Sequence, residues 1–195
     1  MNDNFNYRKY FMITFFIVSL VFFAIFILFH LRPIKTTLYR KSNEKIVNSI
    51  LFIDSLDGAL KTEYYFSDYQ LLGGVEVTLI VEYSETSFNM EIERLETLKN
   101  DMNGKGVVKD SNCQLFNYPT YVTTYIPQKK YEYACVNYEL LTITYIYIEC
   151  MSKGKTSISH NLLPKIYLFD EEIFNQYCYD VYKSSEYKDY SICLY

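Results

Sequence analysis

An uninterrupted apolar segment near the start of the chain constrains its architecture more than any other feature. Residues 10–31 (YFMITFFIVSLVFFAIFILFHL) contain no Asp, Glu, Lys or Arg. As an α-helix this segment would be about 33 Å long, which matches the roughly 30 Å hydrocarbon core of a bilayer. A single segment in lipid satisfies its backbone hydrogen bonds only as a helix. The sequence therefore predicts a transmembrane helix over residues 10–31.

The residues around this segment favour a retained anchor over a cleaved signal peptide. The apolar run exceeds the roughly 7–15 residues that are usual for a signal peptide, and no A-x-A-like site follows it. No cysteine precedes Cys113, which argues against a lipoprotein-type anchor. Pro33 is expected to end the helix, because proline lacks a backbone donor and restricts the residue before it.

Charge is distributed unevenly between the two parts of the chain. Residues 1–41 carry six basic side chains and one acidic one, whereas residues 42–195 carry 13 basic and 22 acidic ones. Basic residues beside an apolar helix suit anionic lipid headgroups. The remainder is acidic and has no basic stripe for phosphates, so we expect no nucleic-acid partner.

Apolar content and element spacing predict one α+β domain after the anchor. Half of all residues are apolar, and about 150 residues beyond residue 41 suffice for one core but not for two ordinary domains. We divide the chain into a cytoplasmic tail (1–9), a transmembrane helix (10–31), a basic juxtamembrane linker (32–41), an α+β globular domain (42–184) and a C-terminal tail (185–195).

Periodicity predicts a mainly antiparallel sheet with about three helices in this domain. Helices are expected over residues 42–53, 86–102 and 171–182, and strands over 60–69, 75–83, 118–126, 131–138, 140–150 and 164–169. Gly58 is expected to adopt a left-handed turn, and the strand over 140–150, apolar on both faces, is expected to be central. The alternation over 75–83 predicts one buried face and one largely wet face that includes Glu76. In helix 86–102 an apolar stripe is expected to exclude Glu91, Glu93, Arg94 and Glu96.

The chain contains 22 tyrosines, and this abundance has two interpretations. One is a low-GC genome, because Tyr, Phe, Asn, Ile and Lys are frequent while Ala is rare. The other is a tyrosine-rich binding face, since tyrosine provides a large amphipathic contact surface at low entropic cost.

Four motifs resemble catalytic or ligand-binding patterns, but each has a simpler structural explanation. Gly154-Lys155-Thr156 lacks the first glycine of a phosphate-binding loop, and Asp101-x-Asn103-Gly104 has Lys99 where a calcium ligand is required. His160 has no recognisable nucleophile context with Cys150 or Ser159. Asp170-Glu171-Glu172 is explained by helix capping. We therefore assign no catalytic, cofactor-binding or metal-binding residue and expect a protein that is not an enzyme.

The cysteines and the flanking charges give opposite predictions for the compartment. Five cysteines in the globular domain favour an oxidising compartment. The globular domain contains Cys113, Cys135, Cys150, Cys178 and Cys193, without metal-ligand spacing. They are either reduced core residues or partners in one or two disulfides, of which Cys178–Cys193 would fix the tail to the last helix. Four basic residues after the apolar run against two before it favour a cytoplasmic domain.

The element order resembles that of small uncharacterised single-pass or lipid-anchored surface proteins of low-GC Gram-positive bacteria. The resemblance lies in the anchor, LKTEYYFSDYQ, the GGVEVTLIVEY strand, the acidic helix, the tyrosine-rich meander and the DEEIFNQYCYDVY helix. It implies an extracytoplasmic domain and no particular activity. We therefore expect a non-enzymatic membrane protein whose exported domain binds a protein or envelope component. The alternatives are an accessory or immunity-type protein that acts through a membrane partner, and a hydrolase with an unrecognised site.

Overall fold

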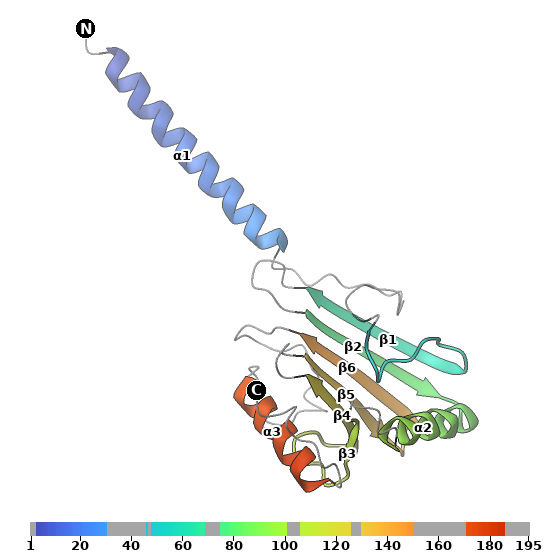
Figure 1. Ribbon diagram of the computed structural model, residues 1–195. Helices are drawn as coiled ribbons and strands as arrows, with labels where there is room; N and C mark the ends of the chain where they lie inside the picture. Colours follow the sequence, from blue (N-terminus) through green and yellow to red (C-terminus); the bar gives the residue numbers. More distant parts are fainter. Residues whose placement is uncertain are drawn as a thin grey trace.

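The computed structural model (Figure 1) shows an α+β domain that follows a long N-terminal helix. It describes residues 3–30, 46, 48–68, 75–100, 106–125, 130–149 and 171–185. The helices are α1 (Asp3–His30), α2 (Glu85–Asn100) and α3 (Glu171–Ser184). The strands are β1 (Ala59–Asp68), β2 (Val75–Tyr83), β3 (Val108–Asp110), β4 (Thr120–Tyr125), β5 (Lys130–Asn137) and β6 (Thr142–Glu149).

The six strands form one antiparallel sheet in the order β1-β2-β6-β5-β4-β3. Strands β4 to β6 make the predicted meander, and the unpredicted strand β3 pairs with β4. Strand β6 also pairs with β2, which precedes it by more than fifty residues. The prediction that residues 140–150 form a central strand is therefore confirmed. The long strand β1 and the three-residue strand β3 lie at the two edges of the sheet.

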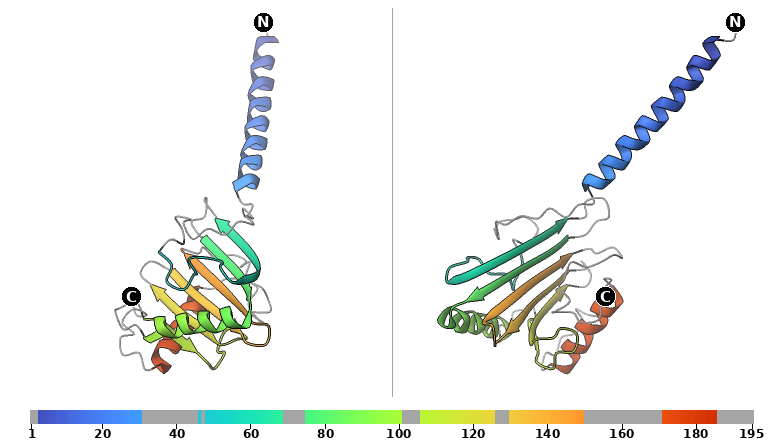
Figure 2. Two further views of the ribbon diagram at one scale, coloured as in Figure 1. Left: turned by 90° about the vertical axis from the view of Figure 1, so that its right-hand side faces the viewer. Right: turned by 180° about the vertical axis from the view of Figure 1, so that it is seen from behind.

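The two helices of the domain cover opposite faces of this sheet (Figure 2). Side chains that alternate along β5 show the division: Ala134 and Val136 belong to the apolar cluster that contains Phe88 and Leu95 of α2. Tyr133 and Cys135 belong to a second cluster, which contains Phe174, Tyr177 and Val181 of α3. We call these the α2 face and the α3 face. Period-two alternation thus supplies both cores from the same central strands.

Tyrosine is a core residue in this domain. The largest fully buried side chains include Tyr121, Tyr131, Tyr133, Tyr145 and Tyr182. On the domain's described residues, the large exposed tyrosines are Tyr65 and Tyr138. The abundance of tyrosine therefore serves packing and does not form a tyrosine-rich surface in this part of the chain.

The predicted helix over residues 42–53 is wrong where the structure describes it. Residue 46 and residues 48–53 form turns and bends, and the backbone N–H groups of Ile50 and Leu51 bond to Glu132 of β5. A carboxylate from a distant strand satisfies donors that a helix would otherwise use. Gly58, directly before β1, has the expected left-handed conformation, with φ of +81°.

Strand β2 is buried on more than the expected face. Val75, Val77, Leu79, Val81 and Tyr83 are buried as predicted. The opposite face was expected to be wet, but Glu76 is 1% exposed and Thr78 is also buried. Burial on this face is confined to the first half of the strand, because Ile80 is half-buried and Glu82 is exposed.

Helix α2 also differs from its predicted pattern. Phe88 and Leu95 are buried and Glu93 is exposed, as expected, but Glu91 is buried and Arg94 and Glu96 are half-buried. In α3, the buried side chains are Phe174, Tyr177, Cys178, Val181 and Tyr182. The predicted strand over 164–169 lies outside the described residues.

Helix α1 covers most of the predicted anchor and is apolar on all sides. Its side chains are described over residues 10–26, and each of these residues is exposed. Phe11, Met12 and Phe22 are at least 70% exposed. Among the described residues, no helix has both the length and the apolar character required to cross a membrane.

Candidate functional site

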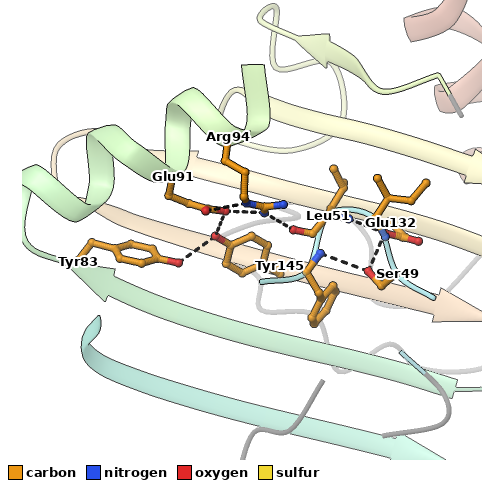
Figure 3. A network of polar contacts seen from close by, with 9 residues as sticks. Ser49, Leu51, Tyr83, Glu91, Arg94, Glu132 and Tyr145 are labelled. Atoms are coloured by element: carbon orange, nitrogen blue, oxygen red, sulfur yellow. Dashed lines mark hydrogen bonds and ion pairs between the residues drawn. The ribbon is translucent and has the colours of Figure 1, made fainter. Parts of the chain in front are cut away.

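The most connected polar site lies on the α2 face of the sheet, between α2 and the segment that precedes β1 (Figure 3). Its centre is a two-pronged ion pair on one turn of α2. Arg94 donates from Nε to Oε2 of Glu91 at 2.8 Å and from Nη2 to Oε1 at 2.6 Å. The paired geometry fixes both side chains, since a guanidinium and a carboxylate match in two parallel hydrogen bonds. The three-residue spacing along a helix places them on one face.

Two tyrosines extend the network into the sheet. Tyr145 of β6 donates from its hydroxyl to Oε1 of Glu91 at 2.6 Å, and its oxygen lies 3.0 Å from the hydroxyl of Tyr83 on β2. Burial, followed by the negative charge of Glu91, raises the pKa of Tyr145 well above its ordinary value. Burial likewise raises the pKa of Tyr83. Both hydroxyls therefore stay protonated at physiological pH and act as hydrogen-bond donors rather than as bases or nucleophiles.

Leu51 joins this network to a second buried carboxylate. Its carbonyl oxygen accepts a 2.6 Å hydrogen bond from Nη2 of Arg94, and its N–H donates to Oε2 of Glu132 at 3.0 Å. The same Oε2 also accepts from Oγ of Ser49 at 2.8 Å and from the N–H of Ile50 at 2.9 Å. Arg94 of α2 and Glu132 of β5 therefore hold the backbone of Leu51, one at its carbonyl oxygen and the other at its N–H.

The contacts of this arrangement join separate elements of the domain. Each oxygen of Glu91 accepts at least one hydrogen bond from within the domain, and Glu132 Oε2 accepts three. A carboxylate that works as an acid or base needs a substrate within reach and a pKa suited to transfer. These groups instead connect β2, β5, β6, α2 and residues 49–51. Such a network specifies how irregular chain packs on a sheet, because each of these buried groups would be costly to leave unpaired.

A smaller polar cluster joins α2 to the far edge of the sheet. Oε1 of Glu96 accepts from Nζ of Lys109 on β3 at 2.7 Å and from the hydroxyl of Tyr121 on β4 at 2.5 Å. Lys99 lies 3.3 Å from Oε2. Partial burial by itself would raise the pKa of Glu96, but the hydrogen bonds from Lys109 and Tyr121 outweigh burial and lower it to about 2.

The α3 face contains a separate set of buried polar contacts. Asp110 accepts from the N–H groups of Asn112 and Gln114, each at 3.0 Å, and from the hydroxyl of Tyr177 at 3.0 Å. These bonds fix the turn after β3. Of the residues named for a calcium loop, Lys99 lies in α2. Residues 101–105 lie outside the described part of the chain.

Cys113, Cys135 and Cys178 belong to the described residues. The sulfur of Cys178 lies 3.7 Å from the hydroxyl of Tyr133, and the suggested Cys178–Cys193 disulfide stays a prediction because Cys193 lies outside the described residues. Cys135 is buried, and burial raises the pKa of its thiol to about 12 despite a hydrogen bond with Thr120. Cys113 is exposed, and its pKa is raised chiefly by partial burial of the thiol. Cys150 and Cys193 lie outside the described residues.

The remaining motifs lie outside the described residues or lack described side chains. Gly154-Lys155-Thr156, His160 and Asp170 belong to the first group, and Glu171 and Glu172 belong to the second. Within the described residues, no three His, Cys, Asp or Glu side chains converge on a point that could hold a metal ion.

Sequence reasoning did not identify the network on the α2 face. Glu91 and Arg94 were expected to lie outside the apolar stripe, and Glu132 was not distinguished from other strand residues. One signal was available: an acid and an arginine three residues apart in a helix with few basic residues. The tyrosine and backbone partners, 43 to 83 positions away in the chain, could not be read from local spacing.

The chain was compared with protein-family models, curated proteins and solved structures. The chain matches no protein-family model, and no curated protein or solved structure is significantly similar to it.

Proposed function

We propose that this chain is a single-pass membrane protein whose globular domain acts outside the cytoplasm as a non-enzymatic binding domain. Residues 10–31 would contact membrane lipid, residues 1–9 would stay in the cytoplasm, and the domain would bind a protein or a component of the cell envelope. The single observation that carries the proposal is the exposed apolar surface of α1.

This surface is difficult to reconcile with an aqueous environment. Every described side chain from Tyr10 to Phe26 is exposed, and most of them are large and apolar. A helix that is apolar all round is normally buried in a large core or in a bilayer. The proposal rests on the full charge-free run of residues 10–31, of which the described side chains form the first part.

The proposed orientation balances opposing signals. The positive-inside rule, applied to four basic residues after the run and two before it, favours a cytoplasmic domain. Lys35, Arg40 and Lys41 lie progressively farther from the apolar run, where their influence on insertion should weaken. The thiol of Cys135 is enclosed in the core, so it gives no support to either compartment. Export therefore rests mainly on the resemblance to surface proteins.

A binding role is supported by apolar side chains gathered at one end of the sheet. Leu60, Met90 and Leu140 are each 67% exposed, and Tyr138 is 48% exposed. Residues 138–141 connect β5 to β6 at this end, where Ala59 of β1 also pairs with Tyr83 of β2. The ring of Tyr138 packs edge-on against that of Phe88 of α2, with 5.7 Å between the ring centroids. Exposed large apolar residues in one region often mark a site of protein association.

Membrane residence can be tested on the full chain by alkaline carbonate extraction. We expect the protein to remain in the membrane pellet, whereas a variant with Phe15→Lys, Val18→Lys and Phe22→Lys should be released. Recovery of the unaltered chain in the carbonate supernatant would refute the anchor.

Replacement of residues 10–31 by an unrelated transmembrane helix distinguishes a binding domain from an accessory protein that acts through a membrane partner. A domain that binds by itself keeps its activity after this exchange, whereas an accessory protein that acts through the helix loses it.

A further inference from the structure

The long edge of the sheet differs from the short one in how it is protected. Strand β3, at one edge, has three residues and packs beside α3. Strand β1, at the other edge, has ten residues and no proline. Leu60, Lys61 and Thr62 are all exposed, although Lys61 and Thr62 point to opposite faces of the sheet. The first half of β1 therefore exposes side chains on both faces of the sheet, and among the described strands only β2 pairs with it.

An exposed edge strand presents unpaired N–H and C=O groups that can pair with another strand. We infer that β1 pairs, antiparallel and edge to edge, with β1 of a second copy of this chain, about a two-fold axis through Thr62. The two sheets would then join into one continuous sheet. The contact would centre on residues 61–63 of each copy, which follow the register shift between Ala59 and Lys61.

Charge selects this register among those that a two-fold axis allows. Lys61 and Glu63 project from the α3 face of β1, with the lysine Nζ 2.9 Å from Oε1 of the glutamate. About Thr62, Lys61 of each copy lies directly opposite Glu63 of the other, so the two opposite-charge pairs support the contact. An axis through Glu63 would place two carboxylates side by side. An axis through Tyr64 would pair Lys61 with Ser67 and leave the charges unmatched.

The same symmetry is compatible with a shared membrane. A two-fold axis perpendicular to the sheet keeps the α2 face of both copies on one side. Ile46, where the described domain begins, is buried in the apolar cluster on that face. Ile46 of both copies therefore lies on the same side of the joined sheet. The pairing does not depend on the anchor, and its test gives a result whether or not α1 lies in lipid.

Engineered cysteines in the full chain, expressed in cells, test both the contact and its register. Cys113 is first replaced by Ser because it is exposed. Paired residues in an antiparallel ladder have Cα atoms about 4.5–5.5 Å apart, which is within disulfide range. Thr62→Cys should therefore give a covalent dimer on mild oxidation. Tyr65→Cys should not, because its two copies would lie about 20 Å apart along the strands. Glu93→Cys, on the exposed side of α2, is the control for random collision.

Charge exchange completes the test in the Thr62→Cys background. Lys61→Glu or Glu63→Lys alone places like charges opposite each other and should reduce the dimer several-fold. The double exchange restores opposite charges and should restore the dimer. The inference is overturned if Thr62→Cys gives no more dimer than its parent or than Glu93→Cys. It is equally overturned if the double exchange dimerises no better than either single variant.

Discussion

Glu132 on β5 accepts the backbone N–H of Leu51 at 3.0 Å, although 81 positions separate the two residues in the chain. Because the same carboxylate oxygen also binds Ser49 and Ile50, one side chain fixes the segment that leads into β1. This contact explains why residues 46 and 48–53 form turns and bends rather than the expected helix. It also predicts where the domain is most sensitive to a single substitution.

Glu132→Leu should destabilise the domain by about 2–4 kcal/mol, because it leaves three donors without their acceptor in a buried site. Glu132→Gln keeps one oxygen acceptor and should cost less. Thermal unfolding of the full chain in detergent micelles, followed by circular dichroism, measures both effects. Glu139→Leu, in the exposed turn after β5, is the matched control and should change stability by less than about 0.5 kcal/mol. Equal stability of the two leucine variants would mean that Glu132 does not hold this segment.

Two glutamates on the same face of β2 provide a second contrast. Glu76→Lys should reduce the free energy of unfolding by about 3 kcal/mol or more, because Glu76 is 1% exposed and the lysine would be charged in a buried site. Glu82→Lys should be tolerated, because Glu82 is exposed near the end of the strand. Urea titration of the two full-length variants measures the difference. If Glu76→Lys proves as stable as Glu82→Lys, the second face of β2 is not buried.

The cluster at Glu96 predicts a specific response to acid. Its pKa of about 2 lies below the ordinary value of 4.5, so the folded state favours the carboxylate. The stabilisation is therefore complete above about pH 4.5 and is lost as the pH falls through the folded-state value near 2. After allowance for partial solvent exposure, we expect it to be on the order of 1 kcal/mol. Glu96→Gln should lower stability at pH 7 and flatten the pH dependence between about 4.5 and 2. A dependence in that range identical to that of the unaltered chain would contradict this role.

Local patterns in the sequence sufficed for most regular elements of the domain. Alternation identified β2, the tyrosine- and threonine-rich runs identified β4 to β6, and the apolar stripes identified α2 and α3. Prediction was wrong where burial depends on distant residues. Glu91 becomes a core residue because Tyr145 and Arg94 satisfy it, and Glu76 is buried although alternation along β2 placed it on the wet face. Periodicity describes how a segment divides its own faces, but it does not reveal which remote side chain will meet a polar group.

Protease treatment of intact bacterial cells that express the full chain tests most directly whether α1 anchors the domain outside the cytoplasm. We predict that added protease digests the domain in intact cells and leaves a membrane-bound fragment containing residues 1–31, while a cytoplasmic marker protein stays intact. A domain that is protected in intact cells and digested only after lysis would contradict the proposed orientation, and the extracytoplasmic binding function would then be wrong.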